Sequence, residues 1–544
     1  MRPEDPDSPA PIIPRQTTTP RPTTTTPSVE EGLVSPTPSS SGMKTMGTAD
    51  TPAPTEARRF NRGDDVFKQE KTDGSQTESN RVVIDPSKEV RKVIGGKDAV
   101  DAETRQMSSV EKSSYEFLQY CGSVVAVVSV ALITALHFAE LTGGAMTSVA
   151  SPLAAPSSWE FIAFVGYIQS LSAIGHLLTR GVPAYLWKYA DAMSWTVFIP
   201  FHGTKSAIGS RRLNDVAIDG LVGFADRVGV RETDLLNQCV AGFLIVLGVL
   251  VLVAAAVWVF NRWKRSQLRL ENDPFSMLLQ REHARGQKRL LVVAGVGVLV
   301  WLFALYPLAA VASFEIAMEV RAKEISSGPL TIACLMLLVV CFGMLALSIT
   351  AIAMMRAEQD MQRPKSRLVW GSLYVDVVYD RRLFFVIPVV AQILSGVFVG
   401  AVEDQTSQLV LLLVLQLIVL ASVLVLRPFV DGSLAHWLAI GITLLRVLNI
   451  ALSFAFVSDG ERASESRARR HIATTILAVN FAVIIVWFLR HFGVLCGLVR
   501  DRMERADADK GELNTTSALA PSSGYQYSSG SSGPGLHTQT YSSL

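Results

Sequence analysis

Long apolar blocks recur between Tyr115 and Arg490, and short polar or charged stretches separate them. The most uniform block, residues 239–260, carries no charged side chain over 22 positions. A helix needs roughly 20 apolar residues to cross the hydrocarbon of a bilayer, which is about 30 Å thick. The pattern therefore predicts an all-α fold, a polytopic transmembrane helical bundle.

Nine blocks are wide enough to be spans. They cover residues 115–138, 159–179, 238–260, 290–314, 329–355, 383–401, 407–426, 432–456 and 472–490. A tenth segment, 182–201, is rich in aromatic residues but contains Lys188 and Asp191. It could be an interfacial amphipathic helix, a re-entrant segment or a polar span, so the count is nine or ten.

The charges between the spans orient them, because cytosolic connections are enriched in Lys and Arg. The 261–289 connection holds eight Lys and Arg residues against three acids, and residues 356–382 and 490–505 are also basic. The acidic turn at Glu403 and Asp404 is then outside. The arginine-rich 457–471 turn conflicts with this arrangement, which three connections support.

The position of the N-terminus depends on the number of spans. Nine spans place it outside, whereas ten place both termini in the cytosol. Arg105 and Lys112 before the first span, against Glu140 after it, favour the cytosol. The chain shows no apolar signal-peptide segment near its start, which favours the same side.

Both ends of the chain are polar, and we expect both to be disordered. The first fifty residues contain ten Pro, ten Thr and six Ser, a composition that cannot bury a core. Such a stretch is an O-glycosylated stalk outside the cell, or a linker or phosphorylated tail inside it. The predicted division is a disordered segment at 1–112, a membrane domain at 113–500 and a flexible tail at 501–544.

Composition narrows the classes of function. The chain has 49% apolar and 18% charged residues with a net charge of +2, so no basic field favours nucleic acid. The five cysteines form no CxxC pair, and we expect neither a metal site nor a cofactor. Phosphate-binding loops and hydrolase motifs are missing, so we expect no enzyme. Transport, a channel or a structural role remain.

Polar side chains inside the spans are the candidates for a solute path, because each is costly in lipid. The candidates are Gln169, His176, Glu315, Glu319, Gln392, Gln416, Arg446 and Asn449. A single Gln or Asn often only forms a hydrogen bond between helices. His176 could be a buried packing residue, and the two glutamates could mark a hydrated interface. Arg446, in the middle of a span, either lines a cavity or acts as a structural clamp.

Ordered motifs in the second half of the chain carry a resemblance. A segment reading WGSLYVDVVYDRRLFF precedes one span, and a span containing Gln416 follows and ends in RPF. This order resembles the transmembrane domain of the TRP-like, flavin-carrier family of fungi and oomycetes, which is related to polycystins. The matching positions are Gly371, Leu373, Tyr374, Tyr379, Phe384, Phe385, Gln408, Gln416, Arg427, Pro428 and Phe429, with Gln169, Pro183, Trp187 and Trp195 upstream.

The resemblance covers roughly residues 115–500 and implies a membrane channel or transporter. Members of the family are linked to calcium-permeable channel activity, to FAD movement into the endoplasmic reticulum and to cell-wall maintenance. They usually carry a signal peptide and a lipid-binding-like β-sandwich before the first span, and this favours an N-terminus outside. Here a Ser/Thr/Pro segment stands in that place, so a lipid-sensing role is in doubt.

Two functions follow from these observations. The first is a TRP-like channel or transporter that moves cations such as calcium, or a small solute such as FAD, across the plasma membrane or an endomembrane. The alternative is a non-transporting scaffold that recruits partners through its tails. The expected partners are the lipid bilayer and the transported ion or solute. A homo-oligomer is left open, and no nucleic acid is expected.

Overall fold

The structure is a computed structural model that describes residues 96–143, 158–179, 181–199, 219–270, 276–322, 327–429, 434–457 and 463–518. Within these ranges the regular elements are helices, and one isolated antiparallel bridge joins Val377 to Phe429. The predicted all-α class is confirmed. The Thr/Pro-rich stretch and the last residues of the C-terminal tail lie outside the described residues.

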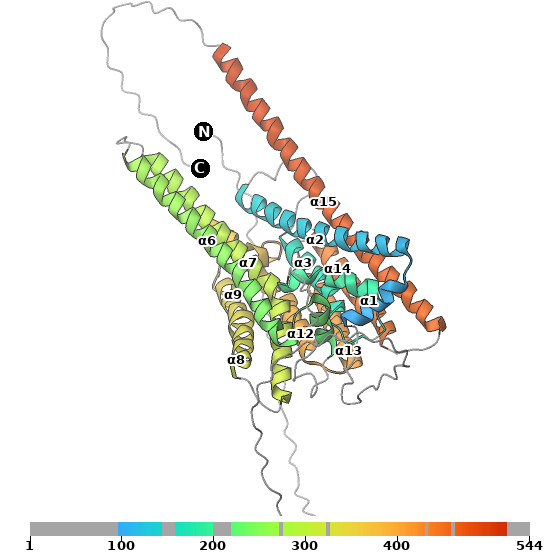
Figure 1. Ribbon diagram of the computed structural model, residues 1–544. Helices are drawn as coiled ribbons and strands as arrows, with labels where there is room; N and C mark the ends of the chain where they lie inside the picture. The colour runs from blue at the N-terminus through green and yellow to red at the C-terminus, as the bar shows by residue number, and fades with distance from the viewer. Residues whose placement is uncertain are drawn as a thin grey trace, which may run out of the picture. The chain divides into compact units, whose positions relative to one another are not determined.

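Nine apolar helical units in the described residues coincide with the nine predicted spans (Figure 1). They are α2 (Ser109–Gly143), α3 (Trp159–Ile174), α6 (Leu235–Leu270), α7 (Ser276–Arg321), the continuous unit α8 (Ser327–Leu335), η6 (Met336–Gly343) and α9 (Met344–Ala353), α12 (Val386–Ala401), α13 (Gln405–Leu426), α14 (Leu434–Ser453) and α15 (Ala463–Ala518). Eight of these units are long and apolar enough to cross a membrane. The exception is α3, whose 16 residues rise only about 24 Å.

The short helix α3 is the centre of the bundle. Nearly all of its side chains are buried, and it contacts α2, α4, α7, α11 and α14. A helix that is apolar on every face is stable only when other groups surround it completely. Because protein rather than lipid surrounds α3, its length need not match the thickness of the bilayer.

The ambiguous segment 182–201 is not a span. It forms the eight-residue helix α4 (Ala184–Asp191) and the 3₁₀ turn η3 (Ser194–Val197). Eight residues rise only about 12 Å, and nearly all side chains of α4 are buried, which also excludes an interfacial amphipathic helix. Arg227 of α5 (Asp219–Val228) holds α4 in place by bonding Asp191 at 2.6 Å. The structure therefore favours nine spans.

One end of the bundle carries most of the basic residues, and we call it the basic end. Here Lys288 of α7 donates to the carbonyl of Thr142, the penultimate residue of α2. Gly295 of α7 lies against the Leu368 carbonyl of α11 (Pro364–Tyr374). The short helices α10 (Glu358–Gln362) and η7 (Tyr379–Arg381) flank α11 in the chain.

The opposite end gathers α1 (Lys97–Gln106), α4, η5 (Glu232–Asp234) and η8 (Phe454–Phe456). The Ala184 amide donates to Glu103 of α1, and the Gly181 amide donates to the Phe456 carbonyl. Gln405, the first residue of α13, also donates to Phe456. The start of α2 and the starts of α13 and α15 therefore lie at the same end of the bundle.

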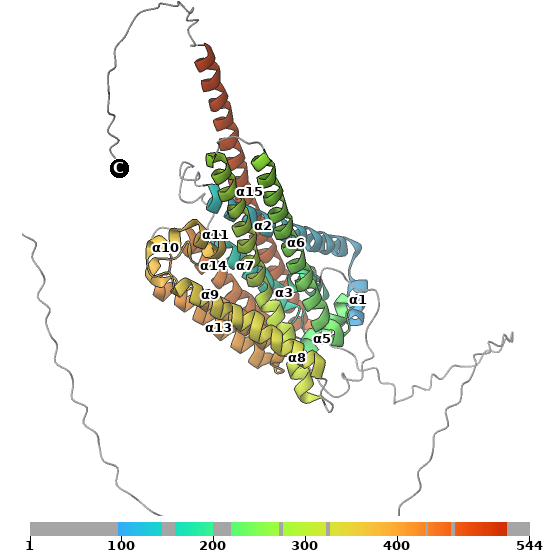
Figure 2. The ribbon, with the colours of Figure 1, turned by 90° about the vertical axis from the view of Figure 1, so that its left-hand side faces the viewer.

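Several helices are longer than the apolar blocks that predicted them. Helix α7 has 46 residues, about 70 Å, and it runs beside α6 through much of the basic connection (Figures 1 and 2). Helix α1 lies within the predicted disordered segment 1–112, and α15 continues past residue 501 to Ala518.

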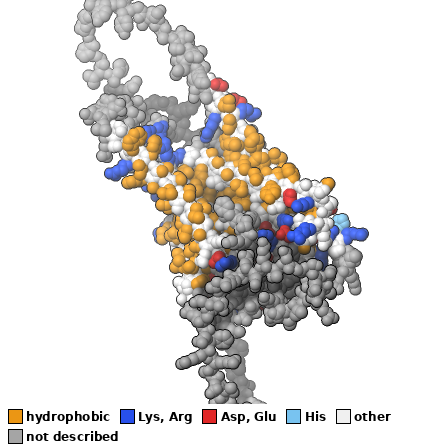
Figure 3. Space-filling model, in the orientation of Figure 1, with side chains coloured by type: hydrophobic (Ala, Val, Ile, Leu, Met, Phe, Trp, Pro, Cys, Tyr) orange, Lys and Arg blue, Asp and Glu red, His pale blue; other side chains and the backbone are white. Residues whose placement is uncertain are grey.

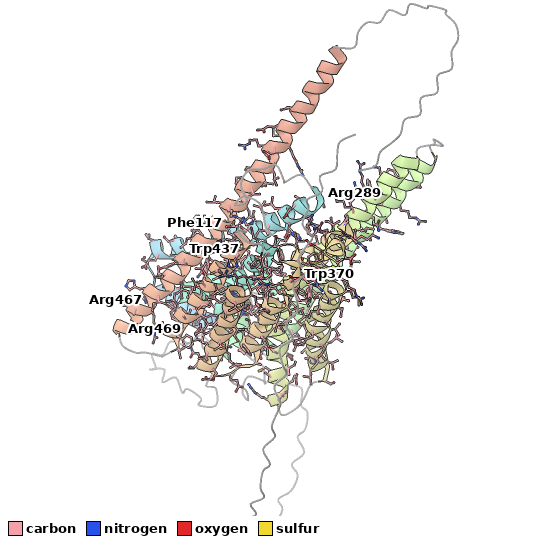
Figure 4. The ribbon with its side chains drawn as sticks, turned by 180° about the vertical axis from the view of Figure 1, so that it is seen from behind. Phe117, Arg289, Trp370, Trp437, Arg467 and Arg469 are labelled. Atoms are coloured by element: carbon pink, nitrogen blue, oxygen red, sulfur yellow. The ribbon has the colours of Figure 1, made fainter. Side chains whose placement is uncertain are left out.

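Lipid-facing side chains cover the outside of the bundle. Figure 3 shows apolar side chains over the middle of the visible face and basic side chains towards its upper margin. Leu252 of α6, Val425 of α13 and Trp437 of α14 are 70%, 79% and 68% exposed. Figure 4 shows Phe117 and Trp437 on outer helices. Such a large exposed apolar surface is expected for a protein immersed in lipid.

The tightest crossing joins α7 to α12. A Cβ added to Gly396 would lie 2.6 Å from the Tyr306 carbonyl, and one added to Gly400 would lie 2.1 Å from the Ala310 carbonyl. Small residues let helix backbones approach closely in membranes, where dispersion contacts drive association. The two glycines therefore fix α12 directly on the backbone of α7.

Candidate functional site

Four helices, α3, α12, α13 and α14, enclose a cavity with Tyr306 of α7. The space inside it that water can occupy is about 40 Å³. The polar residues that line it are Gln169, Ser170, Tyr306, Gln392, Ser395, Gln416, Arg446, Asn449 and Ser453. Five of the eight residues predicted from sequence therefore meet at one cavity, although they come from four separate spans.

A second cavity, with about 30 Å³ of space that water can occupy, lies next to the first towards the basic end. The two share Gly166, Gln392 and Arg446 in their linings. The first cavity reaches Ser453, at the end of α14 away from the basic end, and the second reaches Trp159, the first residue of α3. Together they follow the four helices along most of their length, and the shared residues form the junction between them.

Arg446 dominates the electrostatics of the junction. It is the one charged residue among the described residues that line either cavity. Its Nε is buried without a hydrogen-bond partner, and the side chain forms no ion pair within the described part of the chain. A Cβ added to Gly166 would lie 3.5 Å from Nη1, so the guanidinium reaches across to the backbone of α3. The guanidinium of Arg446 therefore lies where the linings of the two cavities meet.

Most of the predicted amides hold helices together. Gln392 donates to the Oε1 atom of Gln169, and the Nε2 atom of Gln169 donates to the Phe303 carbonyl at 2.6 Å. Asn449 and Asn480 exchange two hydrogen bonds, of 2.9 and 3.1 Å. These bonds tie α3 to α7 and α12, and α14 to α15. Each amide thus has a structural role even where it also faces the cavity.

Gln416 differs from the other amides. It is 1% exposed, and its Oε1 atom has no hydrogen-bond partner in the described residues. A buried amide oxygen without a partner costs free energy, about 1–3 kcal/mol. The buried side-chain atoms of the cavity linings that have no hydrogen-bond partner in the described residues are Gln416 Oε1, Arg446 Nε and Trp159 Nε1.

Three predicted residues do not line the cavities. His176 is buried beside them, with Nδ1 3.0 Å from the Tyr306 hydroxyl and its ring packed on Phe224. Glu315 and Glu319 are buried on α7, 1% and 0% exposed, rather than at a hydrated interface. The structure therefore separates these side chains from the group that meets at Arg446.

The motif residues mostly build a joint at the basic end. Arg427, at φ 41°, ends α13 in the left-handed region. The Val378 amide bonds the Pro428 carbonyl at 2.9 Å, next to the Val377–Phe429 bridge. Arg381 donates to the Arg427 carbonyl. The RPF motif therefore attaches the end of α13 to η7, just before α12.

The remaining motif residues pack near this joint. Tyr374 donates to the Met361 carbonyl at 2.8 Å, and Phe385 is fully buried. A Cβ on Gly371 would lie 3.5 Å from Leu141 of α2. Phe384 and Trp159 form an aromatic pair at 5.7 Å between ring centroids, and both line the second cavity. These two rings therefore contribute to the lining of that cavity on the side of the basic end.

Sequence reasoning missed two features. Gly166 has no side chain that sequence reasoning could single out. It matters because its bare backbone leaves room for the guanidinium of Arg446. Glu160 is 1% exposed and accepts hydrogen bonds from Arg490 and from His491, at the far end of the chain. A carboxylate at the start of an apolar block can indicate a buried ion pair. The spacing of residues along the sequence does not predict which side chains are the partners of Glu160.

The comparisons with known proteins identify the family. The sequence-family model described as transient receptor potential (TRP) ion channel matches residues 202–505, which is more than half of the chain. The chain belongs to the TRP ion channel family. The TRP-like resemblance is therefore confirmed, and the match covers α5 to most of α15, including Arg446. No curated protein and no solved structure shows significant similarity to the chain.

Membership of the TRP family and the apolar helices together make this a multi-pass membrane protein and support a membrane channel. The match begins after α3 and α4, so it omits Gly166 and Gln169. One wall of the cavity therefore comes from a helix outside the matched region.

Proposed function

We propose that this TRP-family protein conducts a small solute along the two cavities between α3, α12, α13 and α14. The observation that carries the proposal is their junction at Gly166, Gln392 and Arg446. A conduction pathway needs polar groups along its length in an otherwise apolar bundle. Five of the intramembrane polar residues converge here from four spans, whereas the outer faces are apolar.

The resemblance to the TRP-like, flavin-carrier family implies two classes of cargo, cations such as calcium and a small solute such as FAD. Nothing in this pathway requires a hydrolytic or redox step, and we propose a transport function without enzymatic activity. Among the described residues, no group of three His, Cys, Asp or Glu side chains could hold a metal ion. A calcium path would therefore depend on backbone carbonyls and amides rather than on a fixed carboxylate site.

Flux through the junction is the direct test. The full chain is reconstituted in liposomes, and uptake of calcium and of FAD is measured with the Gly166→Leu variant. A leucine here fills the space beside Arg446, so we expect at least a tenfold loss of whichever flux the wild-type protein supports. Gly441→Leu is the matched control, because Gly441 of α14 has open space around it.

Two results would contradict the proposed path. One is the absence of flux in the wild-type protein under every gating condition. The other is unchanged flux in a folded Gly166→Leu variant. The non-transporting scaffold predicts the first result. It also predicts that removal of residues 1–95 abolishes binding of a partner while Gly166→Leu leaves that binding intact.

A further inference from the structure

Two titratable side chains of α2 are buried where this helix ends beside α11, at the basic end. His137 is 3% exposed, and Glu140 follows it by three residues, on the same face of the helix. Gly371 of α11 packs against the adjacent Leu141, where an added Cβ would lie 3.5 Å away. Neither titratable side chain lines the two cavities of the proposed path.

Three buried polar atoms at this place have no hydrogen-bond partner in the described residues. They are Oε2 of Glu140, Nδ1 of His137 and Nε of Arg367 on α11. Arg367 acts electrostatically on both α2 side chains, so the three groups lie near one another. A buried carboxyl without a partner is far less unfavourable as the neutral acid than in its ionised form.

The charges around Glu140 also oppose its ionised form. Those that act on it are Asp376, which follows α11, Glu160 of α3 and Arg367. The charged groups on neighbouring elements that already bond other parts of the protein are Lys288 of α7 and Arg490 and His491 of α15. An ionised Glu140 therefore faces two carboxylates and one guanidinium.

We infer that Glu140 is a proton-binding site that makes the joint between α2, α3 and α11 sensitive to pH. A proton removes the negative charge that faces Asp376 and Glu160, and it gives the buried carboxyl a hydrogen-bond donor. Any regulation of flux by this site rests on the proposed path, whereas binding of the proton does not.

A cleft at the basic end brings water next to the site. About 340 Å³ of the cleft can hold water, and its lining includes Glu358 of α10, Arg367 of α11 and Tyr379 of η7. Arg367 thus belongs both to the cleft and to the group of charges around Glu140. Protons can therefore exchange with the solvent at the basic end without passing through the two cavities.

The charge of Glu140 is linked to the start of α3 through Asp376. This carboxylate accepts a hydrogen bond from the Trp159 amide at 2.7 Å, and Trp159 lines the second cavity. An ionised Glu140 repels Asp376, whereas a neutral one does not. The start of α3, and with it one part of the cavity lining, should therefore be held more firmly at lower pH.

Thermal unfolding of the purified full-length chain in detergent tests the inference without any flux measurement. The buried site favours the neutral acid more than the unfolded chain does, so Glu140 contributes stability that is lost as the pH rises. The variant Glu140→Gln is neutral at every pH. We expect its Tm to gain about 2–4 °C relative to that of the wild-type protein between about pH 5.5 and 8.5.

Glu116→Gln is the matched control, because Glu116 is also on α2 but its side chain is 47% exposed. The Tm difference between this variant and the wild-type protein should stay constant over the same pH range. Arg367→Gln removes the cation that favours an ionised Glu140, so the fall in Tm should move to higher pH. This variant keeps the test valid if Glu140→Gln does not fold.

Hydrogen exchange of the Trp159 amide provides a local measurement. At the high end of the pH range this amide should exchange several-fold faster in the wild-type protein than in Glu140→Gln. Its bond to Asp376 is weakened only where Glu140 is ionised. Because the two proteins are compared at the same pH, the intrinsic pH dependence of exchange cancels.

Two results would overturn the proton site. One is a Tm difference between Glu140→Gln and wild type that does not change with pH. The other is a pH-dependent difference that appears with His137→Phe instead. Equal exchange of the Trp159 amide in the two proteins would refute the link to α3. A pH-dependent difference in a protein without flux supports the proton site and refutes the proposed path, and flux without that difference does the reverse.

Discussion

At the scale of single residues, partners decide what each polar side chain does. Gln169 and Gln392 are 223 positions apart and bond each other, whereas Arg446 has no such partner. Sequence could locate these residues, because polar groups interrupt apolar blocks. It could not assign partners, because hydropathy does not specify which spans pack together. The same limit hid the buried contact between Glu160 and Arg490.

Glu160→Gln should destabilise the protein. The carboxylate accepts from both Arg490 and His491, and the amide would leave a partly buried guanidinium without its counter-ion. Breaking one partner of a buried ion pair costs about 3 kcal/mol or more. Thermal unfolding of the full chain in detergent measures the loss as a lower Tm.

The control for that experiment is Glu504→Gln. Glu504 pairs with Arg500 on α15, but both side chains are well exposed, at 69% and 76%. Exposed pairs contribute little, so its Tm should stay within a degree or two of the wild-type value. Equal losses in the two variants would show that Glu160 does not join α3 to α15.

At the scale of elements, the hydropathy blocks predicted where helices lie better than where they end. All nine blocks became helices, but α7 and α15 continue well beyond the apolar residues because charged residues extend a helix into water without penalty. Segment 182–201 became α4 because its aromatic residues pack against protein. The π-helical η6 was not foreseen, since its sequence is uniformly apolar.

Gly400→Leu should disrupt the packing of α12 on α7. The first added carbon would already lie 2.1 Å from the Ala310 carbonyl, so the helices must separate. Overpacking of this kind costs about 3 kcal/mol. The Tm of the purified variant measures the effect, and Gly248→Leu on the open face of α6 provides the control. Similar Tm values for both variants would contradict the close crossing.

At the scale of the whole molecule, the described chain has a basic end and an opposite end, and the start of α2 lies at the opposite end. Positive residues favour the cytosol, so the structure supports an N-terminus outside. The charges near the first span favour the opposite side, but Arg105 belongs to α1, which packs on the bundle.

An epitope placed at the N-terminus should therefore be digested when protease is added to intact cells or to sealed vesicles of matching orientation. An epitope placed after residue 518 should be protected, because α15 continues from the basic end. The C-terminal epitope is also the control for sealed membranes. Protection of both epitopes would contradict the nine-span arrangement and support ten.

The four helices that enclose the cavity differ in how firmly contacts and hydrogen bonds hold them to neighbouring helices. The glycine crossing fixes α12 on α7, the paired amides join α3 to α12, and Asn449 joins α14 to α15. Helix α13 is bonded near its two ends, by Gln408 to the Val399 carbonyl and by Arg427 to Arg381. In the middle of α13, the polar side chain is that of Gln416, whose Oε1 atom has no hydrogen-bond partner in the described residues. A bowing of α13 outward into lipid would therefore widen the cavity without breaking a side-chain hydrogen bond to another helix in the middle of α13.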